Sequence, residues 1–179
     1  MAPCVDGGLV TLATCKPQIR RSARPGDWIA GFLPRPHPRG LLTYVGRVHH
    51  VLDVGIYEKQ FRGRADAVYR LVPDGTFRRL KPDYHDNPND LRKDTSSPVL
   101  IFDEDATWYF GDRPQALPPK LIHLSAAGRG HRVNGAHEGD VKALERWLRR
   151  RWSPSINRQP QNETAICSPR QSRHCGARQ

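Results

Sequence analysis

The chain has 179 residues, a formal net charge of +11 and a sequence pI near 10.1. Its length fits one domain with a real core, and its charge favours a polyanionic partner over an apolar one. Without an apolar run near the ~18 residues of a membrane span or a hydrophobic signal segment, we expect a cytoplasmic protein with no membrane partner.

The positive charge is concentrated at the two ends of the chain. From Arg149 onwards, seven arginines face one acid, Glu163, which accounts for +6 (7 − 1) of the total. Residues 1–50 carry seven basic side chains against Asp6 and Asp27, a surplus of +5 (7 − 2). Cations held on a fold support phosphate binding more strongly than a high pI does, because each can displace a counterion. A solvated basic surface is the alternative.

The most informative stretch runs from Thr11 to Val48. A basic, proline-broken run over 15–21 leads to the turn signal Gly26-Asp27, and alternating residues 28–32 then predict a half-buried strand. Residues 41–48 predict a second strand. We therefore expect a basic binding loop beside a hairpin-like element. The candidate phosphate ligands in it are Lys16, Arg20 and Arg21, and the candidate stacking or ligand-orienting residues are Trp28, Tyr44 and Asp27.

Residues 11–28 form a block that reads Thr11-Leu12-Ala13-Thr14-Cys15-Lys16-Pro17-Gln18-Ile19-Arg20-Arg21-Ser22-Ala23-Arg24-Pro25-Gly26-Asp27-Trp28. This block resembles the nucleotide modification associated domain 2 (Nmad2) family. The resemblance covers roughly residues 2–152. Further segments that carry it are Phe61-Arg62, Val99-Leu100-Ile101-Phe102, Tyr109-Phe110-Gly111 and Gly130-His131-Arg132. It implies a link to systems that modify DNA bases and a barrel-like fold similar to the PUA, ASCH and EVE group, whose members hold a nucleotide in a basic cleft. Members usually have a strand before the Ala-Pro segment, which leaves open whether an edge strand is missing here.

The middle of the chain combines a turn with an irregular stretch. Pro73-Asp74-Gly75-Thr76, between Leu71 and Phe77, predicts a hairpin. Residues 82–97 are acidic and rich in Asn and Pro, and their irregular spacing argues against a metal site. We expect a mobile insertion that covers the binding face. The candidate ligand contacts within it are Asp83, Tyr84 and His85.

Two apolar runs follow. Residues 99–102 are continuously apolar, as in a strand buried on both faces, and 108–110 continue the pattern after an expected acidic turn at 103–105. Both runs belong to the predicted core, although Tyr109 could belong to a base-stacking surface.

The Gly-rich, basic segment 127–135 precedes a helix. Its backbone N–H groups can hold an anion, and Arg129, His131 and Arg132 would add charge-assisted hydrogen bonds. The alternative is that the glycines simply turn the chain into the helix.

The closing helix is predicted to begin at Asp140 as its N-cap, with apolar residues at helical spacing up to Trp152. Glu145 and Arg149 are expected to pair on another face. Residues 149–151 suit the helix dipole, a role that competes with DNA contact. Residues 153–179 have too few apolar side chains to offset their ordering entropy, so we expect a domain of residues 1–152 and a disordered basic tail.

These observations predict an α+β domain with a mostly antiparallel, barrel-like sheet that binds a nucleotide or a modified base in nucleic acid, without a metal or cofactor. An enzyme acting on a modified base, with Asp27 or His131 as acid or base, is a second hypothesis. Asp27 more readily caps the turn, and known catalytic signatures are missing, which favours a binding module. A protein-interaction adaptor in a phage or defence system is a third. The four cysteines form no disulfide or metal framework.

Overall fold

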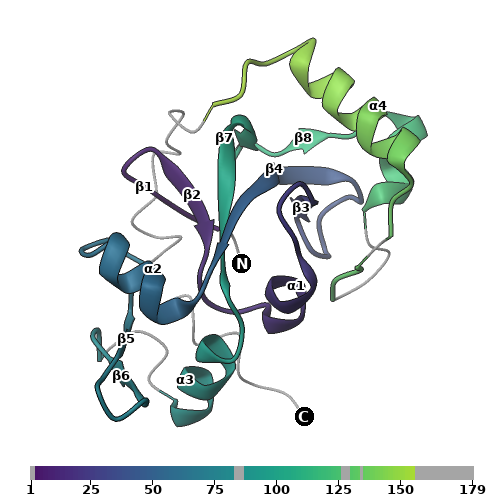
Figure 1. Cartoon of the computed structure of the whole chain (residues 1–179). Helices are drawn as coiled ribbons and strands as arrows, with labels where there is room; N and C mark the ends of the chain where they lie inside the picture. Colours follow the sequence, from purple (N-terminus) through teal and green to yellow (C-terminus); the bar gives the residue numbers. More distant parts are fainter. Residues whose placement is uncertain (1–2, 83–86, 126–129, 134, 156–179) are drawn as a thin grey trace.

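The computed structural model describes residues 3–82, 87–125, 130–133 and 135–155. Its main sheet is antiparallel, with strand order β1-β2-β7-β4-β3, and β8 pairs with the first residues of β4 (Figure 1). β5 and β6 form a separate hairpin. The strands are β1 (Cys4–Asp6), β2 (Leu9–Leu12), β3 (Trp28–Phe32), β4 (Leu41–Leu52), β5 (Tyr69–Leu71), β6 (Phe77–Arg79), β7 (Val99–Tyr109) and β8 (Gln115–Ala116).

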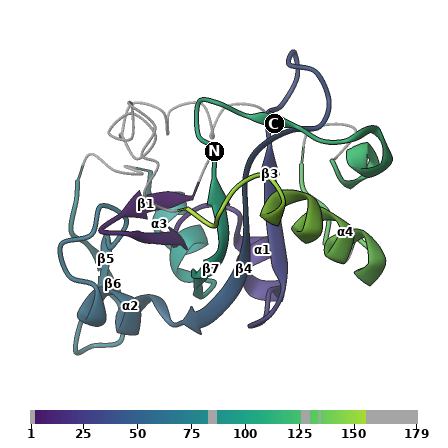
Figure 2. The same cartoon turned by 90° about the horizontal axis from the view of Figure 1, so that it is seen from above.

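Helices lie at both ends of this sheet. α2, α3 and the β5–β6 hairpin lie at one end and α4 lies at the other, as Figures 1 and 2 both show. The helices are α1 (Pro17–Ser22), α2 (Val54–Gln60), α3 (Pro88–Thr95), the 3-10 helix η1 (Pro119–Leu124) and α4 (Glu138–Arg149).

Three clusters of buried side chains form the core between the main sheet and the elements that cover it. Alternation along β7 sends Leu100 and Phe102 to one face, which α1 covers, and Val99 and Ile101 to the other. The second cluster packs against α2 and the β5–β6 hairpin, and a third lies under α4 and η1 around Trp108. The sheet is therefore covered on both faces, which explains the continuous apolar run that the sequence shows in β7.

The strands predicted at 28–32 and 41–48 are confirmed, as is the hairpin around Asp74, whose carboxylate accepts hydrogen bonds from the amide and hydroxyl of Thr76. The prediction of an acidic turn at 103–105 is wrong. Those residues lie inside β7. On β4 one residue separates Gly46 from Val48, whereas four residues of β7 separate their partners, Thr107 and Phe102. The acidic stretch therefore forms a bulge within one strand.

Other predictions need correction. The basic loop contains α1, because proline at the first helical position is compatible with a helix start. The irregular stretch 82–97 contains α3, in which the side chain of Asn87 accepts a hydrogen bond from the amide of Asn89. α4 begins at Glu138, so Asp140 lies in its first turn and is not its N-cap.

The sheet is open, so the barrel expectation is wrong. Its strand path runs from β1 to β3, and among the described residues each of these edge strands pairs with a single neighbour. A barrel needs its two edges to pair with each other. The mixed composition of helices and an antiparallel sheet is confirmed.

The described fold extends slightly beyond residue 152. The amide of Ser155 donates to the carbonyl of Thr107 at 3.0 Å, and Ser155 forms a parallel bridge with Trp108. Residues 156–179 lie outside the described part, so the predicted tail stays a prediction. Within the described residues, none of the helices has the length and apolar character that crossing a bilayer requires.

Candidate nucleic-acid interface

The turn before α1 holds an unusual backbone conformation. Cys15 and Lys16 have φ values of 58° and 44°, in the left-handed region that non-glycine residues rarely adopt. The amide of Cys15 donates to the Asp94 carboxylate at 2.7 Å, and its carbonyl accepts from Arg20 at 3.3 Å. These bonds stabilise a strained turn, a feature that often accompanies functional sites.

Arg20 is the central residue in the contacts that stabilise this turn. Its side chain is 0 % exposed and lies 4.0 Å from the carboxylate of Asp94. The guanidinium donates to four backbone carbonyls, those of Cys15, Asp94, Ser97 and Pro98. Burial lowers the pKa of Arg20 to about 10, which still leaves it charged at neutral pH. A phosphate could reach this group only after it left its present acceptors, so the geometry supports a positioning role.

A second buried network braces the neighbouring strand β2. The Thr11 hydroxyl donates to Asp66 at 2.5 Å, and the Tyr57 hydroxyl donates to the other oxygen of that carboxylate at 2.7 Å. Arg64 donates to the Tyr57 oxygen at 2.8 Å and to the carbonyls of Asp6 and Leu9. Burial, together with the nearby Asp66 charge, raises the pKa of Tyr57 well above its ordinary value.

Sequence reasoning missed this network. Its members come from β2, α2 and the segment before β5, and their local patterns carry no shared motif. A polar residue inside an otherwise apolar strand, such as Thr11 in β2, is the signal that could have pointed to a buried partner.

The remaining predicted residues of the first motif have different surroundings. Lys16 is half-buried and Arg21 is exposed, so both can meet a ligand at the surface. Asp27 accepts a hydrogen bond from the amide of Arg24 at 2.8 Å, the turn-capping role that the sequence favoured. Trp28 stacks on Trp108 with ring centroids 6.3 Å apart. Tyr44 is only 7 % exposed, and it packs in the cluster under α1.

The predicted glycine-rich loop is described only in part. Arg129 lies outside the described residues. Arg132 is exposed and donates to the carbonyls of His123 and Leu124 at 2.8 Å each, which ties it to the end of η1. Among the described residues, no hydrogen bond or ion pair joins Arg132 or His131 to α1.

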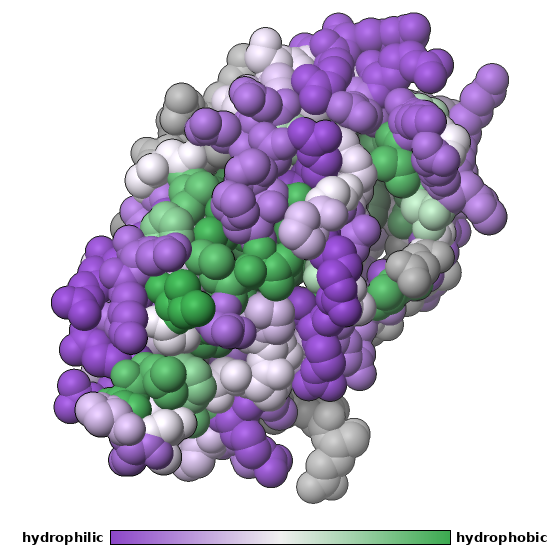
Figure 3. All heavy atoms as spheres, in the orientation of Figure 1, coloured by the Kyte–Doolittle hydropathy of each residue, from purple (hydrophilic) through white to green (hydrophobic). Residues whose placement is uncertain are grey.

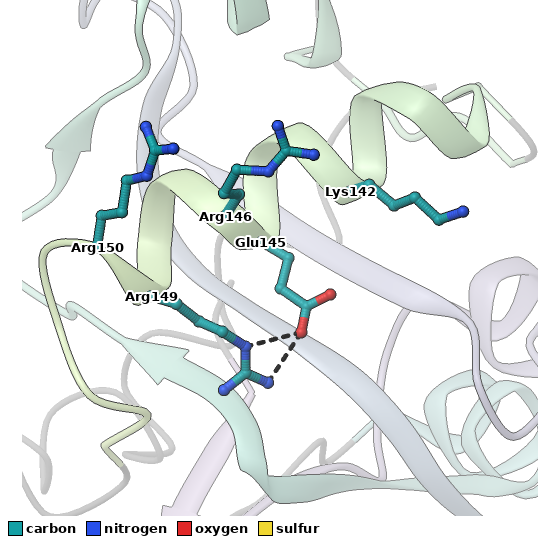
Figure 4. A pocket seen from close by; sticks show the side chains of 5 residues that line it. All are labelled: Lys142, Glu145, Arg146, Arg149 and Arg150. Carbon is teal, nitrogen blue, oxygen red and sulfur yellow. Dashed lines mark hydrogen bonds and ion pairs between the residues drawn. The ribbon is translucent and has the colours of Figure 1, made fainter.

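A further cationic surface lies on α4. A shallow hollow of about 430 Å³, largely open to solvent, is lined by Lys142, Glu145, Arg146, Arg149 and Arg150. Figure 4 shows that Arg146 and Arg150 extend from the same side of the helix, whereas Glu145 and Arg149 face each other. Within the described part of the chain, Arg146 and Arg150 have no acidic side chain within ion-pair distance. We call Lys142, Arg146 and Arg150 the α4 cation row.

Arg149 has a structural role next to this row. It donates to Glu145 at 2.9 Å and to the carbonyl of Asp105 at 3.2 Å, and its guanidinium lies 5.4 Å from the centre of the Trp108 ring. The predicted pair with Glu145 is thereby confirmed. These contacts attach α4 to the bulge of β7.

The family comparison agrees with the resemblance carried by the first motif. The sequence model of the family described as nucleotide modification associated domain 2 matches residues 1–167. The chain belongs to this family. No curated protein matches the chain. No solved structure matches it either.

Two residues of the Nmad2 motif have structural roles. Thr11 and Arg20 are both 0 % exposed, and they belong to the two buried networks that hold β2 and the turn before α1. In this Nmad2 protein the most recognisable block therefore builds a rigid turn, and Lys16 and Arg21 are carried at its surface. The family name associates the protein with nucleotide modification.

Proposed function

We propose that this Nmad2 protein binds nucleic acid through the α4 cation row, as a recognition module of a nucleotide-modifying system. The observation that carries the proposal is the row of exposed cations on α4, next to which Glu145 is already paired with Arg149. Three cations on a fixed helix offer phosphate contacts at little ordering cost to the backbone.

The spacing of the row suits an extended polyanion. Residues four apart on a helix lie on one face, about 6 Å apart along the axis. Lys142 forms an exposed pair with Glu138 at 2.6 Å, which is weak enough to exchange for a phosphate. The row can therefore follow consecutive phosphates of one strand, without reading their sequence.

Lys16 and Arg21 form a second proposed contact. The strained turn and the buried Arg20 position them, and the predicted contributions of Arg129, His131 and Arg132 would come from the segment after η1. These residues would bind the modified nucleotide itself, whereas α4 would hold the backbone.

The test is the affinity for a fluorescently labelled oligonucleotide at several salt concentrations. Changing Lys142, Arg146 and Arg150 together to Ala should weaken binding more than 10-fold at low salt. It should also reduce the slope of log affinity against log salt by roughly 3, about one per lost phosphate contact.

The matched control replaces Arg78, Arg92 and Lys93, three exposed cations of β6 and α3, by Ala. It removes the same charge at the other end of the sheet and should leave the salt slope within about one unit of the original. Equal losses from the two triple variants would mean that net charge alone attracts the oligonucleotide, and the α4 interface would be rejected.

A further inference from the structure

Three aromatic rings meet beside the C-terminal end of the α4 cation row. Trp147 and Trp152 have centroids 5.3 Å apart at an interplanar angle of 78°, and Phe110 lies 5.1 Å from Trp152 at 67°. All three side chains are half-buried at the margin of the cluster under α4. Each ring is therefore supported on one side by the core while part of it stays accessible.

The platform is held rigidly. The amide of Trp152 donates to the carbonyl of Leu148 at 2.9 Å, and its own carbonyl accepts from the indole of Trp108 at 3.1 Å. Trp147 lies on α4 itself. Rings that are already ordered lose little conformational entropy when a flat ligand stacks on them.

A cation lies on one ring of this aromatic platform, and another is next to it in the sequence. The guanidinium of Arg151 lies 5.5 Å from the centre of the Trp147 ring, and Arg150 and Arg151 are both exposed. The cation over Trp147 thus belongs to an exposed surface side chain. A base can take its place on the ring or stack between the ring and the guanidinium.

We infer that Phe110, Trp147 and Trp152 form a stacking site for an unpaired base, so that the α4 surface binds single-stranded nucleic acid in preference to duplex. The inference rests on the proposed binding of a phosphate backbone to the α4 cation row. Aromatic surfaces next to basic grooves are the usual arrangement for single strands, whose bases are free to stack on a side chain. In a duplex the bases are already stacked on each other.

The experiment compares a single-stranded oligonucleotide with the same sequence as a duplex, by anisotropy titration on the full chain. The single strand should bind more tightly to the original protein. Trp147→Ala should weaken single-strand binding roughly 5- to 100-fold, the effect of losing one base–aromatic stack. Duplex binding should change less than about 3-fold, and Trp147→Phe should recover part of the single-strand affinity.

Phe61→Ala is the control, because Phe61 is a half-buried aromatic at the other end of the sheet, in contact with Tyr57. It should lower stability without changing the ratio of single-strand to duplex affinity. A Trp147→Ala protein with an unchanged ratio would overturn the stacking site, even if the α4 triple variant still lost affinity for both ligands. If the triple variant kept full affinity for both, the proposed function itself would be rejected.

Discussion

At the scale of single residues, the structure separates cations that hold the fold from cations that are free to bind. Arg20 and Arg21 are neighbours in a basic motif, yet one is 0 % exposed and the other is exposed. Helical geometry points successive side chains about 100° apart, so adjacent positions can serve opposite purposes. A count of charges in this motif therefore overstates the number of phosphate ligands.

Replacing Arg20 by Met should reduce the free energy of unfolding by about 3–5 kcal/mol, because four backbone carbonyls would lose their donor and the buried Asp94 carboxylate would lose its nearby positive charge. Arg21→Met, with an equal loss of charge on an exposed side chain, should change it by less than about 0.5 kcal/mol. Urea unfolding measures both. Similar values for the two variants would contradict the supporting role of Arg20.

Lys16 offers a test of the strained turn. Its φ of 44° costs a residue with a Cβ roughly 1–2 kcal/mol, which glycine avoids. Lys16→Gly should therefore be more stable than Lys16→Ala by about 0.5–1 kcal/mol, after the larger backbone entropy of glycine in the unfolded chain is subtracted. Thermal or urea unfolding of the two variants gives the difference, and a less stable glycine variant would argue against the left-handed turn.

At the scale of elements, the bulge of β7 links the sheet to α4. Arg47 on β4 donates to Asp103 at 2.5 Å and 3.2 Å, and Asp105 accepts from Arg149 through its carbonyl. Partial burial opposes ionisation of Asp103, but the hydrogen bond from Arg47 and the amide of Asp105 outweigh it, so that the pKa of Asp103 falls below its ordinary 3.8. The carboxylate of Asp103 thus holds the Arg47 side chain, and the backbone carbonyl of Asp105 holds that of Arg149.

This bulge should contribute to the acid sensitivity of the fold. A carboxylate with a lowered folded pKa adds stability above its unfolded pKa, and that stability is lost as the pH falls through the folded pKa. Asp103→Asn should therefore be less stable at neutral pH, by under about 1 kcal/mol because Arg47 is 45 % exposed. Its unfolding free energy should also fall less between roughly pH 5 and pH 2. The exposed neighbour Glu104→Gln should follow the original protein, and parallel pH profiles for all three would remove the assigned role.

At the scale of the whole molecule, an open antiparallel sheet separates two helical ends. α2, α3 and the β5–β6 hairpin cover one end, and the described chain returns at Ser155 to β7 near the other (Figure 1). Figure 3 shows a continuous apolar area that extends from α2 over the neighbouring strands, with polar side chains around it. The α4 end carries the cation row instead, so the two ends offer different surfaces.

Two truncations test where the folded unit ends. Removing residues 156–179 should leave the unfolding temperature nearly unchanged, although it should weaken nucleic-acid binding and its salt dependence, because four arginines and one acid are lost. Removing residues 153–179 also deletes the bonds of Ser155 to β7 and should cost about 1 kcal/mol more. Calorimetry and oligonucleotide titration give the two readouts, and equal unfolding temperatures for the two truncations would show that Ser155 adds nothing.

The sequence by itself determined the family, strands β3 and β4, the β5–β6 hairpin, the apolar run at 99–102 and the Glu145–Arg149 pair. Local periodicity, turn residues and helical spacing encode these features over a few positions. Only the tertiary structure decided that Arg20 is buried, that Thr11 joins Tyr57, Arg64 and Asp66, and that the sheet stays open. Each of these depends on which distant segments share one small volume, and burial changes the free energy of a charge or a polar group in a way that no local pattern records.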